Sequence, residues 1–227
     1  YGARAAYIVG AAGSANTLAD YMYRVPASGT MAHSWVQSFD TEYEAFEVYA
    51  KTYPDATVLL VDTYNTLKTG IPNAIKVFDN VLKPLGKRPV GIRLDSGDLA
   101  YLSKKARVML DESGYEDCKI IVSSSLDEFK VKDIIHQGGQ IDSFGVGERL
   151  ITSKSNPVFG GVYKLVAVEK NGEVIPRIKI SENIEKITTP GVKQVYRIYD
   201  DQTNKAKADL ITLIDEEINA VSYTHLT

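Results

Sequence analysis

A histidine follows a Gly-Thr turn early in the chain, in the segment Gly29–Ser34 with the sequence GTMAHS. The pattern places His33 in the first turn of a helix, where unpaired backbone N–H groups and the positive end of the helix dipole stabilise negative charge. An anion, or a phosphorylated imidazole, would be stabilised at that place. The competing interpretation is a histidine that packs or makes a hydrogen bond for structural reasons alone. His33 is therefore a candidate catalytic residue.

A second polar segment, Arg93–Asp98, follows an apolar run and has the sequence RLDSGD. Asp95 can accept two hydrogen bonds from a sugar diol, and Arg93 can bind a carboxylate or a phosphate through two parallel hydrogen bonds. The structural alternative is that Asp98 caps the next helix while Asp95 pairs with Arg93. We favour the cap for Asp98 and a role in substrate binding or catalysis for Arg93 and Asp95.

Two further strand ends carry small residues that suit an anion. Gly145 and Gly147 could bring backbone amides close to a phosphate, although a tight turn explains the same spacing. A dinucleotide-binding fingerprint needs a third glycine where Leu150 stands, so that motif is absent. Ser123 ends another apolar run, either to contact a ligand or to cap the helix that follows.

The elements that must position these side chains follow a repeating pattern of short apolar runs and helical stripes. Strands are predicted at residues 57–62, 89–95, 119–124 and 143–147. Helices are predicted at residues 33–50, 71–85, 99–109 and 126–137. Strands that are apolar throughout are typical of a parallel sheet covered by helices on both faces. Their polar ends, which include Asp62, would meet at one edge, as at the mouth of a βα-barrel or in the crevice of an open doubly wound sheet.

The pattern changes after about residue 160. A hairpin is predicted from residues 163–168 and 174–180 with a turn at Asn171-Gly172, followed by a strand at 194–199 and a helix at 210–218. We therefore expect a partial α/β-barrel domain at 1–158, a β-rich module at 159–221 and a tail of doubtful origin at 222–227. The sequence is expected to be a piece of a longer protein.

Composition narrows the class of protein. The chain has 227 residues, 44% hydrophobic and 24% charged, with a formal net charge of −3. No basic run suggests nucleic-acid binding, and no apolar run has membrane-spanning length. The single cysteine, Cys118, excludes a disulfide within the chain and a multi-cysteine metal site. We expect a cytoplasmic protein that has no nucleic-acid or membrane partner and no metal held by its own side chains.

Taken together, these segments resemble one family. Residues 29–34, 60–66, 91–100 and 144–150, leading to 160–164, are similar to nicotinate phosphoribosyltransferase. The resemblance runs in order from about residue 1 to residue 218. It implies an α/β fold, the irregular type II phosphoribosyltransferase barrel, here partial, joined to a β-rich second domain.

The resemblance also implies an activity. Nicotinate would be joined to 5-phosphoribosyl 1-pyrophosphate to give nicotinate mononucleotide and pyrophosphate, in NAD biosynthesis. ATP hydrolysis would be coupled through a phosphohistidine, with Mg²⁺ on the pyrophosphate and a homodimer as the complete enzyme. His33 matches the phosphorylated position, and Asp95 would orient the ribose hydroxyls. The positions that would bind substrate are Thr30, Arg93, Ser123, Gly145, Gly147 and Glu148.

The sequence departs from the family pattern at two places. Glu148 stands where many relatives carry threonine, and Ser124-Ser125 replace the Asn-Asp often found before Leu-Asp-Glu. Three competing functions stay open beside the nicotinate enzyme. They are a nicotinamide phosphoribosyltransferase, which uses the uncharged amide, a non-catalytic module that binds sugar phosphates, and a fragment with no activity of its own.

Overall fold

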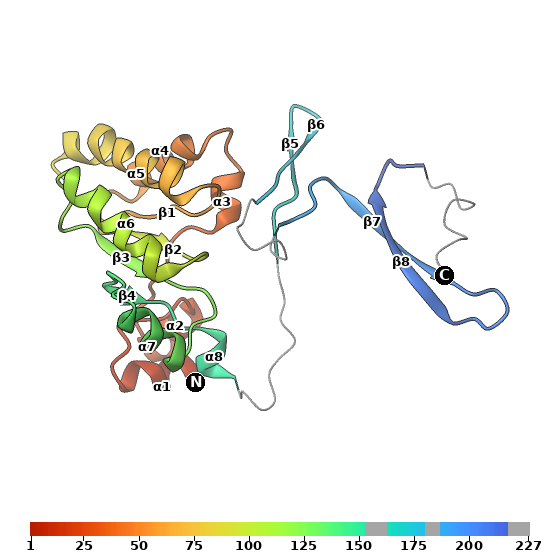
Figure 1. Cartoon of the computed structure of the whole chain (residues 1–227), viewed down its shortest axis with the longest axis horizontal. Coiled ribbons are helices and arrows are strands. Elements are labelled where there is room, and N and C mark those ends of the chain that lie inside the picture. The colour runs from red at the N-terminus through yellow and green to blue at the C-terminus, as the bar shows by residue number, and fades with distance from the viewer. Residues whose placement is uncertain (153–162, 180–186, 218–227) are drawn as a thin grey trace. The chain divides into compact units, whose positions relative to one another are not determined.

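The structure, a computed structural model, describes residues 1–152, 163–179 and 187–217. The chain divides into two compact units (Figure 1). The first comprises Tyr1–Lys164 and Lys179–Ile187, and the second comprises Leu165–Ile178 and Thr188–Thr227. The boundary predicted at residue 158 and the tail predicted at 222–227 both lie outside the described residues.

A parallel sheet forms the centre of the first unit, as predicted. Its strands are β1 (Val58–Leu60), β2 (Gly91–Leu94), β3 (Lys119–Val122) and β4 (Ser143–Phe144). They are adjacent in chain order, and every neighbouring pair is parallel. Leu60 pairs with Arg93, and Val122 pairs with both Leu94 and Phe144. This register brings the carboxyl ends of all the strands to one edge, where the polar residues follow.

Helices connect the strands, and local side-chain chemistry fixes where they begin and end. They are α5 (Ile71–Val77), α6 (Leu99–Glu112), α7 (Glu128–His136) and the short α8 (Glu148–Ile151). Asp98 caps α6, because its Oδ1 accepts from the Tyr101 N–H at 2.9 Å, which confirms the predicted cap. The cap of α7 is Asp127, whose Oδ1 accepts from the Lys130 N–H, so a serine cap, the alternative left open from sequence, does not form.

The predicted helix at 33–50 is two helices, α3 (His33–Gln37) and α4 (Glu42–Thr52). Thr41 interrupts it, because its extended backbone starts α4 and its Oγ1 accepts from the Glu44 N–H at 3.1 Å. The apolar spacing continues through the break, which is why the pattern resembles that of a single helix. Two more helices precede these at the start of the chain, α1 (Gly2–Ile8) and α2 (Thr17–Tyr23).

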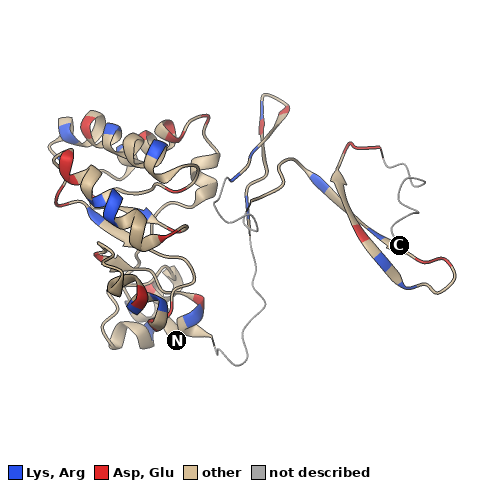
Figure 2. Cartoon of the chain, in the orientation of Figure 1, with Lys and Arg blue, Asp and Glu red and all other residues tan. Residues whose placement is uncertain are grey.

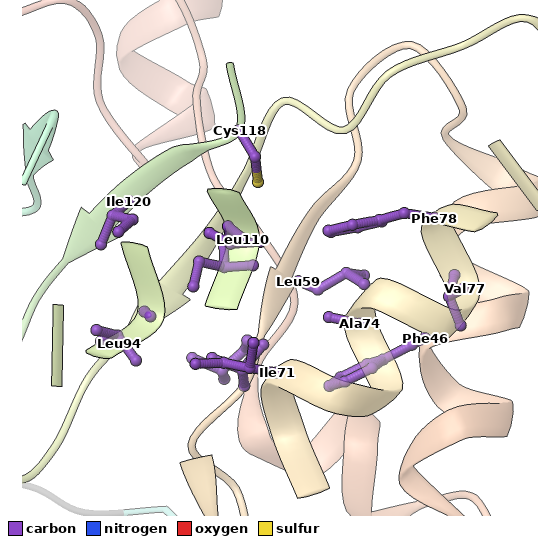
Figure 3. Close-up of a cluster of buried hydrophobic side chains, with 14 of the residues drawn as sticks. Phe46, Leu59, Ile71, Ala74, Val77, Phe78, Leu94, Leu110, Cys118 and Ile120 are labelled. Atoms are coloured by element: carbon purple, nitrogen blue, oxygen red, sulfur yellow. The ribbon is translucent and has the colours of Figure 1, made fainter. Parts of the chain in front are cut away.

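The core of the first unit lies between the sheet and the helices on it (Figure 3). Phe46 of α4, Leu59 of β1 and Ile71 of α5 are fully buried and meet in this cluster. Burying a side chain of this size contributes about 1.5–3 kcal/mol relative to leaving it in water. Phe78 and Leu82 extend the cluster through a π-helical turn, η2 (Phe78–Leu82), so the predicted helix at 71–85 is only partly α-helical.

A glycine determines how closely the chain packs behind the first strand. Gly70 ends the π-helical turn η1 (Thr66–Gly70), and a Cβ built on it would lie 1.8 Å from the carbonyl oxygen of Val61. A glycine is required there because the obstacle is backbone and not a flexible side chain. The close contact brings η1 against the backbone of Val61, the residue directly before Asp62.

We expect Gly70→Ala to lower the free energy of unfolding by about 2–4 kcal/mol, because the backbone of η1 must move away from β1. Urea denaturation of the purified variant measures the loss. Gly29→Ala is the matched control, since nothing lies within 4 Å of a Cβ there, and it should change stability little. Equal urea midpoints of unfolding for Gly70→Ala and the unchanged protein would contradict the requirement for glycine at this position.

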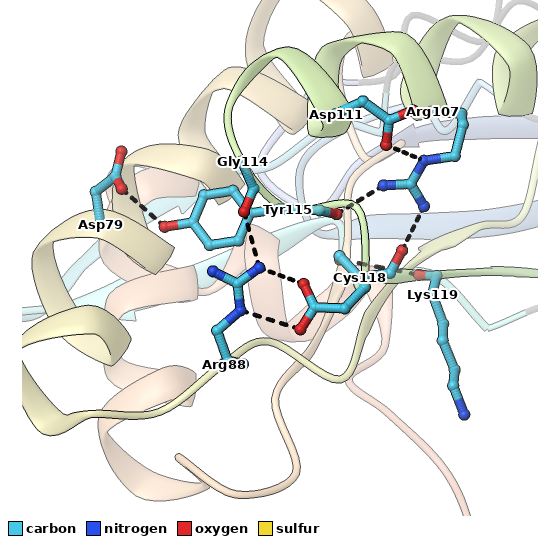
Figure 4. A network of polar contacts seen from close by, with 9 residues as sticks. Asp79, Arg88, Arg107, Asp111, Gly114, Tyr115, Cys118 and Lys119 are labelled. Atoms are coloured by element: carbon cyan, nitrogen blue, oxygen red, sulfur yellow. Dashed lines mark hydrogen bonds and ion pairs between the residues drawn. The ribbon is translucent and has the colours of Figure 1, made fainter.

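A polar network supports the connection from α6 to β3 (Figure 4). Arg107 donates from its two terminal nitrogens to the carbonyl oxygens of Tyr115 and Cys118, at 2.6 and 2.7 Å. The Tyr115 hydroxyl donates to Asp79 at 2.7 Å. Burial raises the pKa of the Cys118 thiol to about 12, so this cysteine stays a neutral thiol inside the core. The network satisfies buried backbone carbonyls and holds the loop that leads into β3.

The second unit contains two antiparallel hairpins. Strands β5 (Ala167–Lys170) and β6 (Glu173–Pro176) flank the predicted Asn171-Gly172 turn, where both residues have positive φ as the turn requires. Strand β7 (Lys193–Tyr199) pairs with β8 (Ala206–Leu213), so the predicted helix at 210–218 is wrong over its described residues. Between β7 and β8 the chain reverses in a turn, which Asp200 stabilises by accepting from the Gln202 and Thr203 N–H groups.

Charged residues of both signs are scattered over the helices of the first unit (Figure 2). Among the described residues, no helix has the length and apolar character needed to cross a membrane.

Candidate active site

His33 is the first residue of α3, as the sequence predicts, and it is 8% exposed. Its Nε2 lies 3.1 Å from Oδ1 of Asp62, in the segment that follows β1. Because α3 has only five residues, its dipole is weak, and the partner of the imidazole is this carboxylate. The pair joins two segments that lie 29 residues apart in the chain.

Asp62 is the centre of the site. While its Oδ1 faces His33, its Oδ2 accepts from the Asp95 N–H at 3.0 Å and from the Ser96 hydroxyl. Burial acts to raise the pKa of Asp62, but the hydrogen bond and charge of His33, with those from Ser96 and Asp95, lower it overall. Asp62 is therefore an ionised carboxylate that links the histidine to the turn after β2. From sequence it is only one of several polar strand ends, with no assigned role.

Arg93 and Thr30 meet beside this pair. The Arg93 guanidinium donates from a terminal nitrogen to the Thr30 hydroxyl at 2.6 Å. Its Nε is buried and has no hydrogen-bond partner among the described residues. A buried guanidinium nitrogen with an unused donor is suited to a carboxylate or a phosphate, because an anion would satisfy both the charge and the hydrogen bond.

Asp95 accepts a hydrogen bond from the Ser123 hydroxyl at the end of β3. In the described part of the chain no ion pair joins Asp95 to Arg93, so the structural pairing considered from sequence does not form. The two residues after Ser123 adopt positive φ, 116° at Ser124 and 48° at Ser125. Such backbone is strained in residues other than glycine, and it commonly marks a functional turn.

The end of β4 contributes less than the sequence indicates. The Gly145 N–H donates to the Val122 carbonyl at 2.7 Å, so this amide is already used in the fold. Gly145 does approach the site, since a Cβ on it would lie 3.3 Å from that of Ser123. Gly147 caps α8 and Glu148 is its first residue, and both are exposed. Neither is joined to His33 or Asp95 by a hydrogen bond within the part of the chain that the structure describes.

Comparison with known proteins decides the family. The family model described as the nicotinate phosphoribosyltransferase (NAPRTase) family matches residues 4–208. The chain belongs to the nicotinate phosphoribosyltransferase family. This agrees with the resemblance of the five sequence segments and with the polar edge of the parallel sheet.

The relatives cover nearly all of the chain, but the chain covers less than half of them. It is 52% identical over 221 residues to nicotinate phosphoribosyltransferase of Bacillus subtilis. This match covers 96% of this chain and 44% of the relative. It is 46% identical over 197 residues to nicotinate phosphoribosyltransferase pncB2 of Mycobacterium tuberculosis, with 86% of this chain and 40% of the relative covered.

A solved structure supports the fold. The match to the crystal structure of human nicotinic acid phosphoribosyltransferase covers 96% of this chain and 49% of the human chain. The TM-score is 0.58 and the sequence identity is 26%. The parallel sheet with additional antiparallel hairpins is thus part of a type II phosphoribosyltransferase fold, as predicted.

Within this family member, the site combines an ionised carboxylate, an imidazole and a guanidinium at one sheet edge. The carboxylate keeps the imidazole oriented, and the guanidinium can take an anion. No group of three or more metal-binding side chains occurs in the residues that the structure describes.

Proposed function

We propose that the complete protein joins nicotinate to 5-phosphoribosyl 1-pyrophosphate, giving nicotinate mononucleotide and pyrophosphate for NAD biosynthesis. ATP hydrolysis is coupled to this reaction through phosphorylation of His33. The observation that carries the proposal is the His33–Asp62 pair, because Asp62 connects the histidine directly to the turn that holds Asp95. Family membership and the residue pattern at positions 29–34 and 91–98 support the same reaction.

The Asp62 contact selects the nucleophilic nitrogen of His33. In the tautomer that donates from Nε2 to the carboxylate, the lone pair of the imidazole lies on Nδ1. Nδ1 attacks the γ-phosphorus of ATP, the new N–P bond forms, and the bond to the ADP oxygen breaks. Asp62 stabilises the positive charge that develops on the ring, as a buried carboxylate does for a histidine base.

In the transfer step, the nicotinate ring nitrogen attacks C1 of the ribose as pyrophosphate leaves. Asp95 would hold the ribose hydroxyls through its second oxygen, with the first fixed by Ser123. Arg93 and Thr30 would bind the nicotinate carboxylate or the phosphoribosyl donor.

Mg²⁺ would neutralise the charge of the departing pyrophosphate when it is bound. The oxygens of Asp62 are used by three donors, so the ion would be held chiefly by substrate phosphates, as is usual for Mg²⁺. The protein side chains then orient the substrates and do not form a closed metal cage.

The substrate range tests the proposal. In the full-length enzyme with ATP, pyrophosphate release should be about 10–100-fold more efficient with nicotinate than with nicotinamide, because a charged hydrogen bond to Arg93 is lost with the amide. The measurement is kcat/KM for each substrate, together with detection of phosphohistidine after incubation with ATP.

The competing functions give different results. Equal or greater efficiency with nicotinamide would identify a nicotinamide phosphoribosyltransferase. Binding of phosphoribosyl pyrophosphate without pyrophosphate release or phosphohistidine would favour a non-catalytic module. We also propose that the complete enzyme is a homodimer and works in the cytoplasm, which agrees with its one, buried, free cysteine in this part of the chain.

A further inference from the structure

Glu42 is a buried acid that the proposed reaction does not use. It is the first residue of α4, yet it is only 6% exposed, whereas Glu44 in the same helical turn is exposed. An acid in the first turn of a helix normally faces water and interacts with the helix dipole there. The burial of Glu42 therefore needs another explanation.

The contacts of Glu42 suit a neutral acid. Its Oε2 accepts from the Asn73 side-chain amide of α5 at 3.0 Å, and its Oε1 has no hydrogen-bond partner among the described residues. Thr69 also lies at the carboxyl, and its hydroxyl, 3.0 Å from the Asn65 carbonyl oxygen, acts to lower the pKa of Glu42. An ionised carboxylate with so few donors and no cationic partner would be poorly compensated for its loss of water.

No neighbouring charge in the described elements compensates Glu42 either. The helices α3, α5 and η2 pack against α4, and Thr69 of η1 lies at the carboxyl. Lys68 of η1, Lys76 of α5 and Asp79 of η2 are exposed, and His33 of α3 is paired with Asp62. Burial raises the pKa of Glu42, the polar groups of Asn73 and Thr69 lower it, and the charge of Asp62 raises it again, for an overall increase.

We propose that Glu42 is a positioning residue for the His33–Asp62 pair, and that in the folded protein it keeps its proton to a higher pH than an exposed glutamate does. Through Asn73 it joins α4, which packs against the helix α3 that carries His33, to α5. In its protonated form it adds no second negative charge to that of Asp62. Opposed protonation of two neighbouring acids is a common arrangement in active sites.

The proposal predicts a pH-dependent stability. Below the pKa that Glu42 has in the unfolded chain, near the ordinary 4.5, the residue is protonated in both the folded and the unfolded state. Its titration then does not change the free energy of unfolding. As pH rises, the unfolded chain loses this proton first, so stability is lost until the folded-state pKa is passed. Glu42→Gln removes the titration, so its melting temperature should exceed that of the unchanged protein by an amount that grows from pH 4.5 upward.

The functional test uses the full-length protein, and its phosphohistidine readout rests on the proposed function. Glu42→Gln should keep the rate of phosphohistidine formation within about threefold, because the amide mimics the neutral acid, whereas Glu42→Ala should lose about tenfold or more. Nitrogen-15 spectra of His33 should show the Nε2–H tautomer in Glu42→Gln and a mixture of tautomers in Glu42→Ala. The matched control is Glu44→Gln, which should change none of these readouts. If Glu42→Ala does not fold, Asn73→Ala provides the same comparison.

If Glu42→Gln slows phosphohistidine formation as much as Glu42→Ala does, the proposal that Glu42 acts as a protonated acid is wrong. An unchanged tautomer and rate in Glu42→Ala would overturn the positioning role. Should the unchanged protein form no phosphohistidine, the proposed function fails. The tautomer and the pH dependence of the melting temperature still decide the role of Glu42.

Discussion

Replacing His33 with alanine is expected to reduce nicotinate-stimulated ATP hydrolysis in the full-length enzyme to background. No other side chain in the described part of the site offers an imidazole held by a buried carboxylate. The measurement is phosphate release from ATP with and without nicotinate, together with retention of phosphate label on the protein.

Asp62→Asn is the informative companion to this variant. It keeps the shape of the carboxylate but removes the charge that orients the imidazole, so phosphorylation should slow by about 10²–10⁴-fold without vanishing. ATP hydrolysis that still responds to nicotinate after His33→Ala would reject His33 as the phosphorylated residue.

Asp95→Asn is expected to lower turnover by about 10²–10³-fold while the melting temperature stays within a few degrees. The amide oxygen can still accept from the Ser123 hydroxyl, so the fold loses little, whereas the charge that we propose to hold the ribose hydroxyls is lost. Steady-state kcat and a thermal melt on the same preparation separate the two effects.

Asp98→Ala is the control for Asp95, three residues further along the same segment. Asp98 caps α6, so its loss should cost about 1 kcal/mol of stability and leave turnover per folded molecule unchanged. If Asp95→Asn instead lowers stability and keeps the activity of the folded molecules, Asp95 serves the fold and not the substrate.

Local patterns were sufficient for the parallel sheet, because strands buried on both faces must be apolar throughout and short turns connect them to helices. The cap at Asp98 follows from a single residue type, an aspartate directly before the helical stripe. Sequence patterns predicted the wrong element where a helix and a strand can show the same spacing of apolar residues. Leu210 and Leu213 fit a helical stripe, but the ladder to β7 places them in a strand.

The central role of Asp62 was beyond local reasoning. Its three partners lie 29, 33 and 34 residues away, and only the packing of the sheet brings them together. The same holds for Glu42, whose burial depends on Asn73 of α5, 31 residues later. A polar residue at a strand end indicates from sequence that chemistry is possible there. The partner that determines the charge of this residue is brought to it only by the fold.

The hydrogen bonds of the site also limit how this protein can be recombined with its relatives. The bonds from Arg93 to Thr30, from Ser96 to Asp62 and from Ser123 to Asp95 all join different parts of the chain. A chimera that exchanges one βα unit for that of a homologue divides at least one of these pairs between two parents. Gene shuffling should therefore yield active enzymes mainly when adjacent units are inherited together, even though the strands themselves are interchangeable in shape.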